Sequence, residues 1–376
     1  MKRNGRIFLL IAAAAMLFAS ACGKSGGESG DKTSAAGTEK AGDAASEKSS
    51  ENGAGSTAAE SEKGSRTVTD MAGNQVTVPE KIERYADAWY AHNEVICMLD
   101  QAKGLVATSQ TKKKGPWMYY VQPNMNNALS TFGDQFNLEE LVAKKPDLVF
   151  DSKEDYREQL NAVGIPLVNV MFKNYDEMKR SVSLTGEILG EEQMASDYCA
   201  YLDGVLAELK EKLSSLSEEQ KPKVLHGNSV YSFSVDGSDT IIDAWISAAG
   251  GRNVASSVNG NMQTVTLEQI LEWDPDYIIT GTSDEVEKIR KDPNWSGLRA
   301  VQEGKVYANP KGVFSWDRYG VEEALQLQWA ASLLHPDLFQ TDIKAKIREF
   351  YQKFLNFDLT EEQAELILQA KPPEEN

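Results

Sequence analysis

Two stretches of the chain repeat one pattern: residues 138–150 read LEELVAKKPDLVF, and residues 267–279 read LEQILEWDPDYII. Each begins with Leu-Glu, continues with apolar residues at the spacing of a helix, and reaches an apolar run directly after Pro-Asp. A short helix followed by a buried strand is typical of parallel sheets that are covered by helices. Because the pattern occurs twice, the sequence predicts two related lobes.

Strand-like and helical segments alternate on both sides of the two repeats, which predicts an α/β fold. The first lobe, residues 66–172, opens with a hairpin whose turn falls at Gly73-Asn74. Residues 173–221 carry apolar positions at helical spacing, and the second lobe, residues 222–376, ends in three helical segments. The expected fold is a pair of doubly wound, Rossmann-like lobes joined by a long α-helix, with a ligand cleft between the lobes.

The first 65 residues are not expected to belong to either lobe. Basic residues precede an apolar run at 7–18, and small residues lead from it to Cys22, a pattern that indicates an export signal over residues 1–21. The run is too short for a bilayer, which needs about 20 apolar residues. The segment Ala19 to Cys22 resembles a bacterial lipobox, which implies that Cys22 is acylated and that the protein is anchored on the extracytoplasmic side of a bacterial cell membrane. Residues 22–65 lack large apolar side chains and are expected to form a disordered tether.

The composition argues against several classes of function. With 57 acidic and 39 basic residues, the chain has a formal net charge of -18, which disfavours a nucleic-acid partner. Besides Cys22, only Cys97 and Cys199 are present, and their apolar or helical surroundings predict buried free thiols. Three histidines make a cluster of metal ligands unexpected. The sequence carries no nucleophile elbow, phosphate-binding loop or zinc-protease motif, so we expect neither enzymatic activity nor a cofactor.

Five features occur in an order that resembles one family of transport proteins. They are VTDMAGNQVTVP at 68–79, AWYAHNEVICMLD at 88–100, the two repeats described above, the stretch 313–339 that begins VFSWDRYGVEE, and FYQKFLNFDLTEEQ at 350–363. Together they resemble the cluster A-III substrate-binding lipoproteins of ABC importers, which are periplasmic binding proteins for ferric siderophores, haem, vitamin B12 and some oxyanions. The resemblance covers residues 66–376.

The resemblance implies a monomeric protein that captures an iron chelate of the ferric-siderophore type between its lobes and delivers it to a membrane permease. Haem, cobalamin or another corrinoid, and an oxyanion such as molybdate are alternative ligands for the same role. A lipid-anchored ligand sensor without transport is a second alternative.

The resemblance also implies that Glu139 and Glu268, one in each repeat, dock on the permease dimer. Two carboxylates at matching positions of related lobes suit charge-assisted contacts with arginine at a fixed spacing. The plainer alternative is that each is an acidic residue favoured by the first turn of a helix.

Ligands of open α/β sheets bind beyond the carboxyl ends of the strands, which directs attention to the segments that follow the predicted strands. Aromatic rings there pack on planar or chelated ligands, while Arg318 and the lysines at 112–114, in a predicted loop at 111–120, complement anionic groups. The candidate ligand-binding residues are Trp89, Tyr90, His92, Lys112, Trp117, Tyr119, Asp151, Asn228, Tyr231, Trp316, Arg318 and Tyr319. Plainer alternatives are that Trp117 and Trp316 belong to lobe cores and that His92 is a capping or core histidine.

Overall fold

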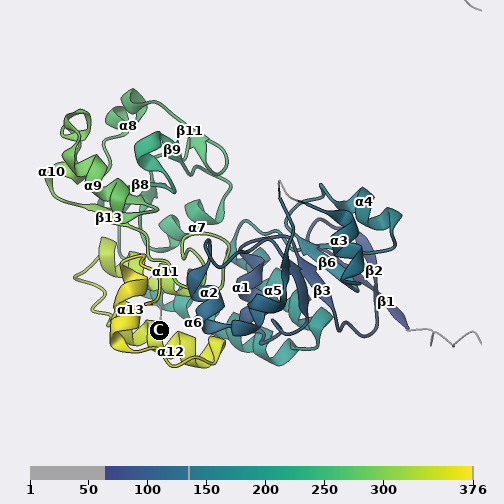
Figure 1. Cartoon of the computed structure of the whole chain (residues 1–376). Coiled ribbons are helices and arrows are strands. Elements are labelled where there is room, and N and C mark those ends of the chain that lie inside the picture. The colour runs from purple at the N-terminus through teal and green to yellow at the C-terminus, as the bar shows by residue number, and fades with distance from the viewer. Residues whose placement is uncertain (1–63, 134–135, 375–376) are drawn as a thin grey trace, which may run out of the picture. The chain divides into compact units, whose positions relative to one another are not determined.

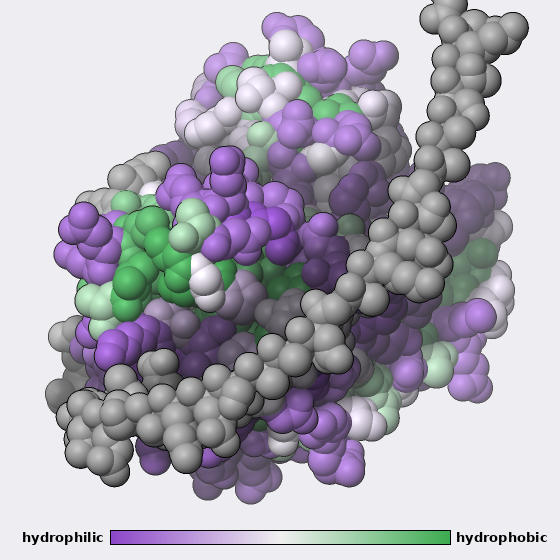
Figure 2. Space-filling view, turned by 90° about the vertical axis from the view of Figure 1, so that its right-hand side faces the viewer, coloured by the Kyte–Doolittle hydropathy of each residue, from purple (hydrophilic) through white to green (hydrophobic). Residues whose placement is uncertain are grey.

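The computed structural model describes residues 64–133 and 136–374. The predicted signal peptide, the acylated Cys22 and all but the last two residues of the predicted tether lie outside this range. Residues Ser61–Asn376 form one compact unit. Within the described residues, no helix combines the length and the apolar character that crossing a membrane requires. Figure 2 shows one face of the protein, on which hydrophilic residues cover most of the surface.

The first lobe is built on a five-stranded parallel sheet with the strand order β5-β4-β3-β6-β7 (Figure 1). An antiparallel hairpin precedes the sheet, and Gly73 at its turn has φ 86°, a conformation that glycine adopts without steric cost. The predicted hairpin is therefore confirmed. The elements of this lobe are β1 (Ser65–Thr69), β2 (Gln75–Pro79), β3 (Tyr85–Asp87), α1 (His92–Met98), β4 (Leu105–Thr108), α2 (Pro116–Val121), η1 (Pro123–Asn127), β5 (Leu129–Ser130), α3 (Leu138–Ala143), β6 (Leu148–Asp151), α4 (Arg157–Ala162) and β7 (Leu167–Asn169).

The second lobe is built on a four-stranded parallel sheet with the order β10-β8-β12-β13, beside which β9 and β11 form a short antiparallel pair. Three further helices follow this sheet in the chain. The elements are η2 (Glu218–Gln220), β8 (Lys223–Gly227), η3 (Val230–Ser232), β9 (Ser234–Val235), α7 (Ile241–Ala248), β10 (Arg252–Asn253), β11 (Gln263–Thr264), α8 (Leu267–Trp273), β12 (Tyr277–Thr280), α9 (Ser283–Lys291), η4 (Pro293–Trp295), α10 (Arg299–Gln302), β13 (Val306–Ala308), α11 (Glu323–Leu334), α12 (Ile343–Leu355) and α13 (Glu361–Leu368).

Two helices lead from the first sheet to the second. Helix α5 (Tyr175–Leu189) ends at Gly190, whose φ of 77° closes it in a left-handed conformation. Helix α6 (Glu192–Leu213) follows at once, and its 22 residues give a length of roughly 33 Å. It packs against α5, α7 and α11, so the predicted long connecting helix is confirmed and has neighbours in both halves of the chain.

The two repeats have the same local structure. Asn137 caps α3 and Thr266 caps α8, each by accepting a hydrogen bond from backbone N–H groups of the first turn. After each helix, the aspartate of Pro-Asp accepts a hydrogen bond from the backbone just before or at the start of a neighbouring strand. Asp147 Oδ2 accepts from the N–H groups of Glu83 and Arg84, at 2.9 and 3.0 Å, and Asp276 Oδ2 accepts from that of Lys223 at 2.7 Å. The repeat therefore reflects two equivalent strand connections.

Two segments differ from the prediction. Residues 116–121 form helix α2 where a loop is predicted, because Pro116 suits the first position of a helix and the apolar side of the short turn is buried. A stretch this short is hard to recognise by periodicity. The charged helix α9 was not predicted either; it begins after Thr282, whose side chain accepts a hydrogen bond from Glu285 N–H. Of the described cysteines, both free, Cys97 is buried as predicted, whereas Cys199 is only half-buried.

The C-terminal segments return to the first lobe. Trp117 Nε1 donates a hydrogen bond to the carbonyl of Lys371 at 2.8 Å, and Gln363 Nε2 donates to Tyr120 Oη at 3.0 Å. Deeper in the protein, the backbone N–H of Glu322 donates to Glu94 Oε1 at 3.0 Å. The two lobes are thus joined by polar contacts as well as by apolar packing.

Glu94 and Glu322 form a fully buried pair of carboxyl groups at this junction. Burial and the like charge of Glu322 raise the pKa of Glu94 well above its usual value near 4.5. Burial also raises the pKa of Glu322, although Tyr351 donates a hydrogen bond to its Oε1 at 2.6 Å. The folded protein therefore retains protons that the unfolded chain releases above about pH 4.5.

This pair predicts how the stability changes with pH. Because the folded state binds more protons than the unfolded state, the free energy of unfolding is expected to fall as the pH rises from about 5 to about 8. Glu94→Gln keeps an oxygen for the Glu322 N–H and removes one ionisable group, so the fall should become smaller. Urea denaturation of both proteins at the two pH values measures this. An equal pH dependence in the two proteins would show that the pair is not its source.

Candidate functional site

The strands of both sheets end at polar residues. In the first lobe, β3 ends at Asp87, β4 at Thr108 and β6 at Asp151, and all three are buried. In the second lobe, the buried His226 lies one residue before the end of β8, and the buried Thr280 ends β12. The carboxyl ends of parallel strands are the usual place for ligands in such sheets, so these edges are where the candidate residues must be sought.

Aromatic residues from both lobes meet near these edges. Trp89 follows β3, Phe172 follows β7, and Tyr319 lies before α11 in the second lobe. The ring centre of Tyr319 lies 5.5 Å from that of Trp89 and 5.6 Å from that of Phe172. Tyr319 has φ 61°, which is uncommon for a residue with a side chain and costs about 1–3 kcal/mol. Its hydroxyl is also held by Asn261, whose Nδ2 lies 2.5 Å away.

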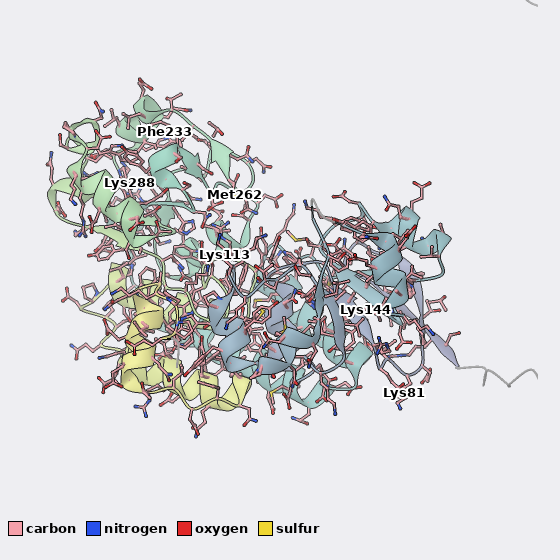
Figure 3. The ribbon with its side chains drawn as sticks, viewed as in Figure 1. Lys81, Lys113, Lys144, Phe233, Met262 and Lys288 are labelled. Carbon is pink, nitrogen blue, oxygen red and sulfur yellow. The ribbon has the colours of Figure 1, made fainter. Side chains whose placement is uncertain are left out.

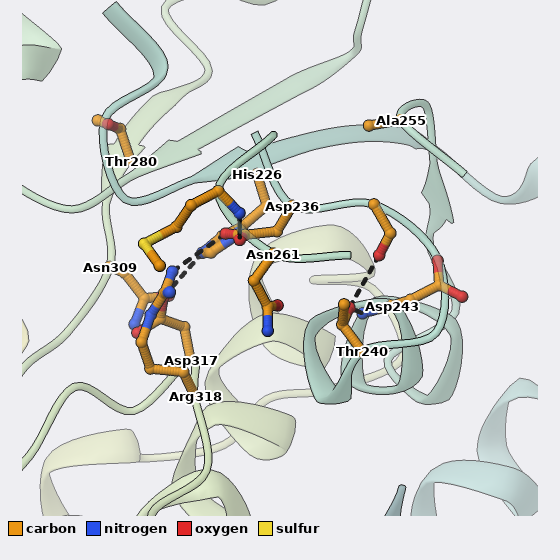
Figure 4. A network of polar contacts seen from close by, with 12 residues as sticks. His226, Asp236, Thr240, Asp243, Ala255, Asn261, Thr280, Asn309, Asp317 and Arg318 are labelled. Carbon is orange, nitrogen blue, oxygen red and sulfur yellow. Dashed lines mark hydrogen bonds and ion pairs between the residues drawn. The ribbon is translucent and has the colours of Figure 1, made fainter. Parts of the chain in front are cut away.

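A network of charged side chains lies beside Tyr319 in the second lobe (Figure 4). Arg318 Nη2 lies 3.0 Å from Asp236 Oδ2 and 3.0 Å from Asp317 Oδ2. His226 joins the same two carboxylates, with Nδ1 3.0 Å from Asp236 Oδ2 and Nε2 3.1 Å from Asp317 Oδ2. The side chains of the aspartates and the histidine are at most 4% exposed, and that of Arg318 is 14% exposed. Figure 4 shows the four converging on one point.

The charges of the network oppose one another. Burial alone lowers the pKa of His226, but its hydrogen bond with Asp236 and the nearby carboxylate of Asp317 outweigh burial and raise the pKa. Burial similarly opposes ionisation of the two aspartates, yet Arg318 and His226 hold the pKa of each below its usual value. Two carboxylates thus face a guanidinium and an imidazole whose protonated form they favour. Arg318 is therefore already paired, and its charge is largely balanced before any ligand arrives.

A hollow of about 380 Å³ lies at the edge of the first lobe beside β4 and β5. Its lining residues follow or end three neighbouring strands and are Tyr90, Ser109, Thr111, Lys114, Ser130, Phe132 and Gly133. Lys114 Nζ donates a hydrogen bond to Tyr90 Oη at 2.7 Å and lies 4.7 Å from the centre of the same ring. The hollow therefore has hydroxyl groups and one ammonium group on its walls.

Three of the predicted ligand-binding residues, His92, Trp117 and Trp316, are at most 1% exposed. His92 lies with Nδ1 2.8 Å from Asp87 Oδ2 and Nε2 2.9 Å from Thr185 Oγ1. Trp117 and Trp316 are 1% and 0% exposed. These positions match the plainer alternatives of a core histidine and two core tryptophans, since none of the three offers a surface to a ligand in this arrangement.

The other predicted ligand-binding residues lie in different parts of the structure. Trp89, Tyr90, Arg318 and Tyr319 lie in the regions just described. Asp151 is 4% exposed at the end of β6, and burial raises its pKa to about 6. Lys112 and Tyr119 line a different hollow, of about 610 Å³, together with Pro372 and Pro373. A role in ligand binding stays a prediction for all of them.

Two further candidates belong to the second lobe. Tyr231 lines a shallow hollow along α9, where its hydroxyl lies 3.1 Å from Asp292 Oδ2. Lys288, labelled in Figure 3, has its Nζ 5.9 Å from the centre of the Tyr231 ring. Asn228 is exposed directly after β8. A role in ligand binding stays a prediction for both Tyr231 and Asn228.

Glu139 and Glu268 are both exposed, and each occupies the second residue of its helix, α3 or α8. The structure thus places the two carboxylates in equivalent first turns of the two lobes, as the repeats predict. Whether they contact a permease stays a prediction.

Sequence reasoning missed several residues that contribute to these regions, including Phe172, Asp236, Asp317 and Ser109. Phe172 was not among the candidate ligand-binding residues, because the sequence pattern indicates only that the strand before it is buried. Asp236, Asp317 and Ser109 are common loop residues in sequence, and their burial is what sets them apart. Asp317 directly precedes Arg318, and these adjacent opposite charges were the one feature of the sequence that could have indicated the network. Among the described residues, no group of three or more potential metal-ligating side chains is placed to hold a metal ion.

These features define a two-lobed solute-binding fold, and comparison with known proteins identifies its family. A family model described as periplasmic binding protein matches residues 90–312, more than half of the chain. The protein therefore belongs to the periplasmic binding protein family, as the sequence resemblance predicts.

Individual relatives agree with this family. The chain is 26% identical over 321 residues to the molybdate-binding protein MolA of Haemophilus influenzae, an alignment that covers 77% of this chain and 90% of MolA. It is 23% identical over 286 residues to YvrC of Bacillus subtilis, named an uncharacterized ABC transporter substrate-binding lipoprotein, with coverage of 73% and 87%.

Solved structures confirm the fold. A periplasmic solute binding protein from Veillonella parvula superimposes with a TM-score of 0.71 at 28% identity, covering 81% of this chain and 97% of the other. The molybdate-bound structure of MolA superimposes with a TM-score of 0.72 at 24% identity, covering 78% and 99%. The expected fold of two α/β lobes is therefore confirmed.

Proposed function

We propose that the protein is the substrate-binding component of an ABC importer that holds an anionic solute where its two lobes meet. The observation that carries this proposal is the contact of Trp89 and Phe172 with Tyr319, since residues far apart in sequence converge there from both lobes. Backbone strain at Tyr319 supports it, because strained residues cluster at ligand-binding sites. Family membership supplies the general role of solute binding.

A small oxyanion is the ligand that we favour. MolA, aligned over 77% of this chain, is named for molybdate. The charges of the second lobe also favour a small ligand. Arg318 is compensated by two aspartates, so it offers little uncompensated charge to a large anionic chelate. The iron chelate implied by the family resemblance is a second candidate, supported by the partly exposed rings of Trp89 and Tyr90 and by Lys114, whose Nζ lies 4.7 Å from the centre of the Tyr90 ring.

The proposal also includes delivery of the solute to a permease and anchoring of the protein to the membrane. A binding protein of this kind must be retained near its permease, and acylation of Cys22 with a flexible tether would do this. The exposed carboxylates of Glu139 and Glu268 are proposed to seat a monomer of the protein on the permease dimer.

Titration of tryptophan fluorescence tests the proposed function. The probes are molybdate, ferric citrate, a ferric hydroxamate, haem and cobalamin, added to the purified protein. Because Trp89 is partly exposed at the lobe junction, a bound solute is expected to change the fluorescence saturably. Trp89→Phe should lose most of that change, whereas Trp273→Phe in α8, away from the junction, should keep it.

The outcomes separate the candidates. Saturation by molybdate alone supports the oxyanion, and saturation by one iron complex alone supports the chelate. Binding without uptake in cells that contain the permease would indicate the sensor alternative. A folded protein that responds to none of the five solutes, in fluorescence or in thermal unfolding, would contradict the proposed function.

A further inference from the structure

The hollow of about 380 Å³ at the edge of the first lobe has a feature that folding alone does not explain. Ser109 is only 3% exposed, and its Oγ has no hydrogen-bond partner among the described residues. A buried hydroxyl without a partner is costly, and buried polar groups in native proteins are nearly always paired. Ser109 also lines the hollow, so its unpaired hydroxyl belongs to the wall of the space that a molecule would enter.

The segment that carries Ser109 is held in place by several bonds. Ser109 N–H donates to the carbonyl of Asp87 at 3.1 Å, and Gln110 N–H donates to Thr108 Oγ1 at 3.0 Å. Thr108 Oγ1 in turn donates to Asn93 Oδ1 at 2.5 Å. Tyr119 Oη donates to the carbonyl of Gln110 at 3.2 Å. The backbone that carries the Ser109 hydroxyl is thus held before a ligand binds, which lowers the entropic cost of binding.

The walls of the hollow suit an anion. Ser109, Thr111 and Ser130 present hydroxyl groups, and Lys114 presents an ammonium group that Tyr90 keeps in position. Among the described residues that line it, none carries a carboxylate. Hydrogen bonds from hydroxyl and ammonium groups to an ionised oxygen are the strong kind. This contrasts with the network of the second lobe, in which Arg318 and His226 each lie beside two aspartates.

The size of the hollow limits the ligand. Pockets for drug-sized molecules range from about 300 to 1,000 Å³, so this hollow is at the lower end of that range. It has room for roughly a dozen water molecules at about 30 Å³ each. A small anion with part of its hydration shell fits this space better than a ferric siderophore does.

We propose that this hollow binds a small tetrahedral oxyanion, with Ser109 and Lys114 as its principal contacts and Thr111 and Ser130 as further donors. The inference rests on the proposed function but places the anion in the first lobe, beside the strand ends, rather than at the aromatic junction between the lobes, and it names the groups that select the anion. It also explains why the Ser109 hydroxyl is buried without a partner in the protein.

The test compares affinity with stability. Molybdate, tungstate, sulfate and phosphate are titrated by calorimetry against the wild-type protein and against Ser109→Ala, Lys114→Met and Lys103→Met. Lys103 is the control because it is exposed and precedes β4, whereas the hollow lies beyond the end of β4. Thermal unfolding of each variant without an anion provides the second measurement.

We expect at least one oxyanion to bind the wild-type protein. Its affinity should fall tenfold or more in Ser109→Ala and in Lys114→Met, and should stay within twofold in Lys103→Met. Ser109→Ala should not lower the unfolding temperature of the free protein, because the hydroxyl has no partner to lose. A purely structural role for Ser109 would give the opposite pattern, with lower stability and unchanged affinity.

Three results would overturn this inference in distinguishable ways. If an oxyanion binds the wild-type protein and both variants equally, the proposed function stands and the hollow is not the site. If no oxyanion binds but an iron complex does, the protein remains a solute-binding protein and the ligand class inferred for the hollow is wrong. If neither class of solute binds the folded protein, the proposed function itself fails.

Discussion

Replacing Arg318 with alanine is expected to lower the free energy of unfolding by about 3–5 kcal/mol. The substitution leaves Asp236 and Asp317 facing each other in the interior, with only His226 to compensate them. Removing one partner from a buried charge network costs more than the network itself contributes, because the remaining charges stay desolvated. Urea denaturation near neutral pH, followed by circular dichroism, measures the loss.

Arg299 provides the matched control for this prediction. It also pairs with two aspartates, Asp274 and Asp276, but its side chain is 47% exposed. Solvent screens such pairs, so Arg299→Ala should cost about 1 kcal/mol or less. Combining Arg318→Ala with Asp317→Asn should recover part of the lost stability. A loss in Arg318→Ala no greater than that in Arg299→Ala would show that the network is not a buried unit.

Reversing the charge of both Glu139 and Glu268 to lysine is expected to abolish uptake while affinity for the solute stays within twofold. The two carboxylates are exposed, lie in equivalent turns of the two lobes, and contribute nothing to the hollow or to the aromatic junction. Transport of the solute selected by the titration is measured in cells that contain the permease, and affinity is measured on the purified protein.

Glu140 and Glu272 allow a control with the same change in net charge. Both are exposed and lie on the same two helices, α3 and α8, but at positions that do not correspond. Their double reversal to lysine should leave uptake largely intact. Loss of uptake in both double variants would indicate a general effect of charge, and loss of affinity in Glu139→Lys/Glu268→Lys would contradict the docking role. Lysine in a first helical turn costs about 0.3–1 kcal/mol, so both proteins should remain folded.

The repeated elements were predictable because their signals are local. Pro-Asp before an apolar run identifies β6 and β12, and apolar spacing over many residues identifies α5 and α6. Helix α2 was missed because its six residues give too short a pattern, and its Pro116 was interpreted as part of a loop. The charged helix α9 was missed because its apolar face is narrow.

The candidate site was harder to predict because it depends on burial and on distant partners. Trp89 and Tyr319 were identified from aromatic residues near strand ends, but the same rule selected Trp117 and Trp316, which lie in the interior. Composition cannot separate these cases, since a tryptophan suits a core as well as a ligand. The pairing of Arg318 with Asp236 joins residues 82 positions apart, and no local pattern reports it.

The return of the C-terminal segments to the first lobe has a consequence for the order of folding. Each sheet is formed by its own continuous stretch, residues 85–169 and 223–308, so each can assemble from neighbouring parts of the chain. The bond from Trp117 to Lys371 instead spans 254 positions, and it can form only when the last helices have been synthesised. Contacts of such long range are slow to form. The junction of Trp89, Phe172 and Tyr319 is thus expected to be completed after both sheets, whereas the hollow of the first lobe, whose lining residues lie between positions 90 and 133, can form with its own sheet.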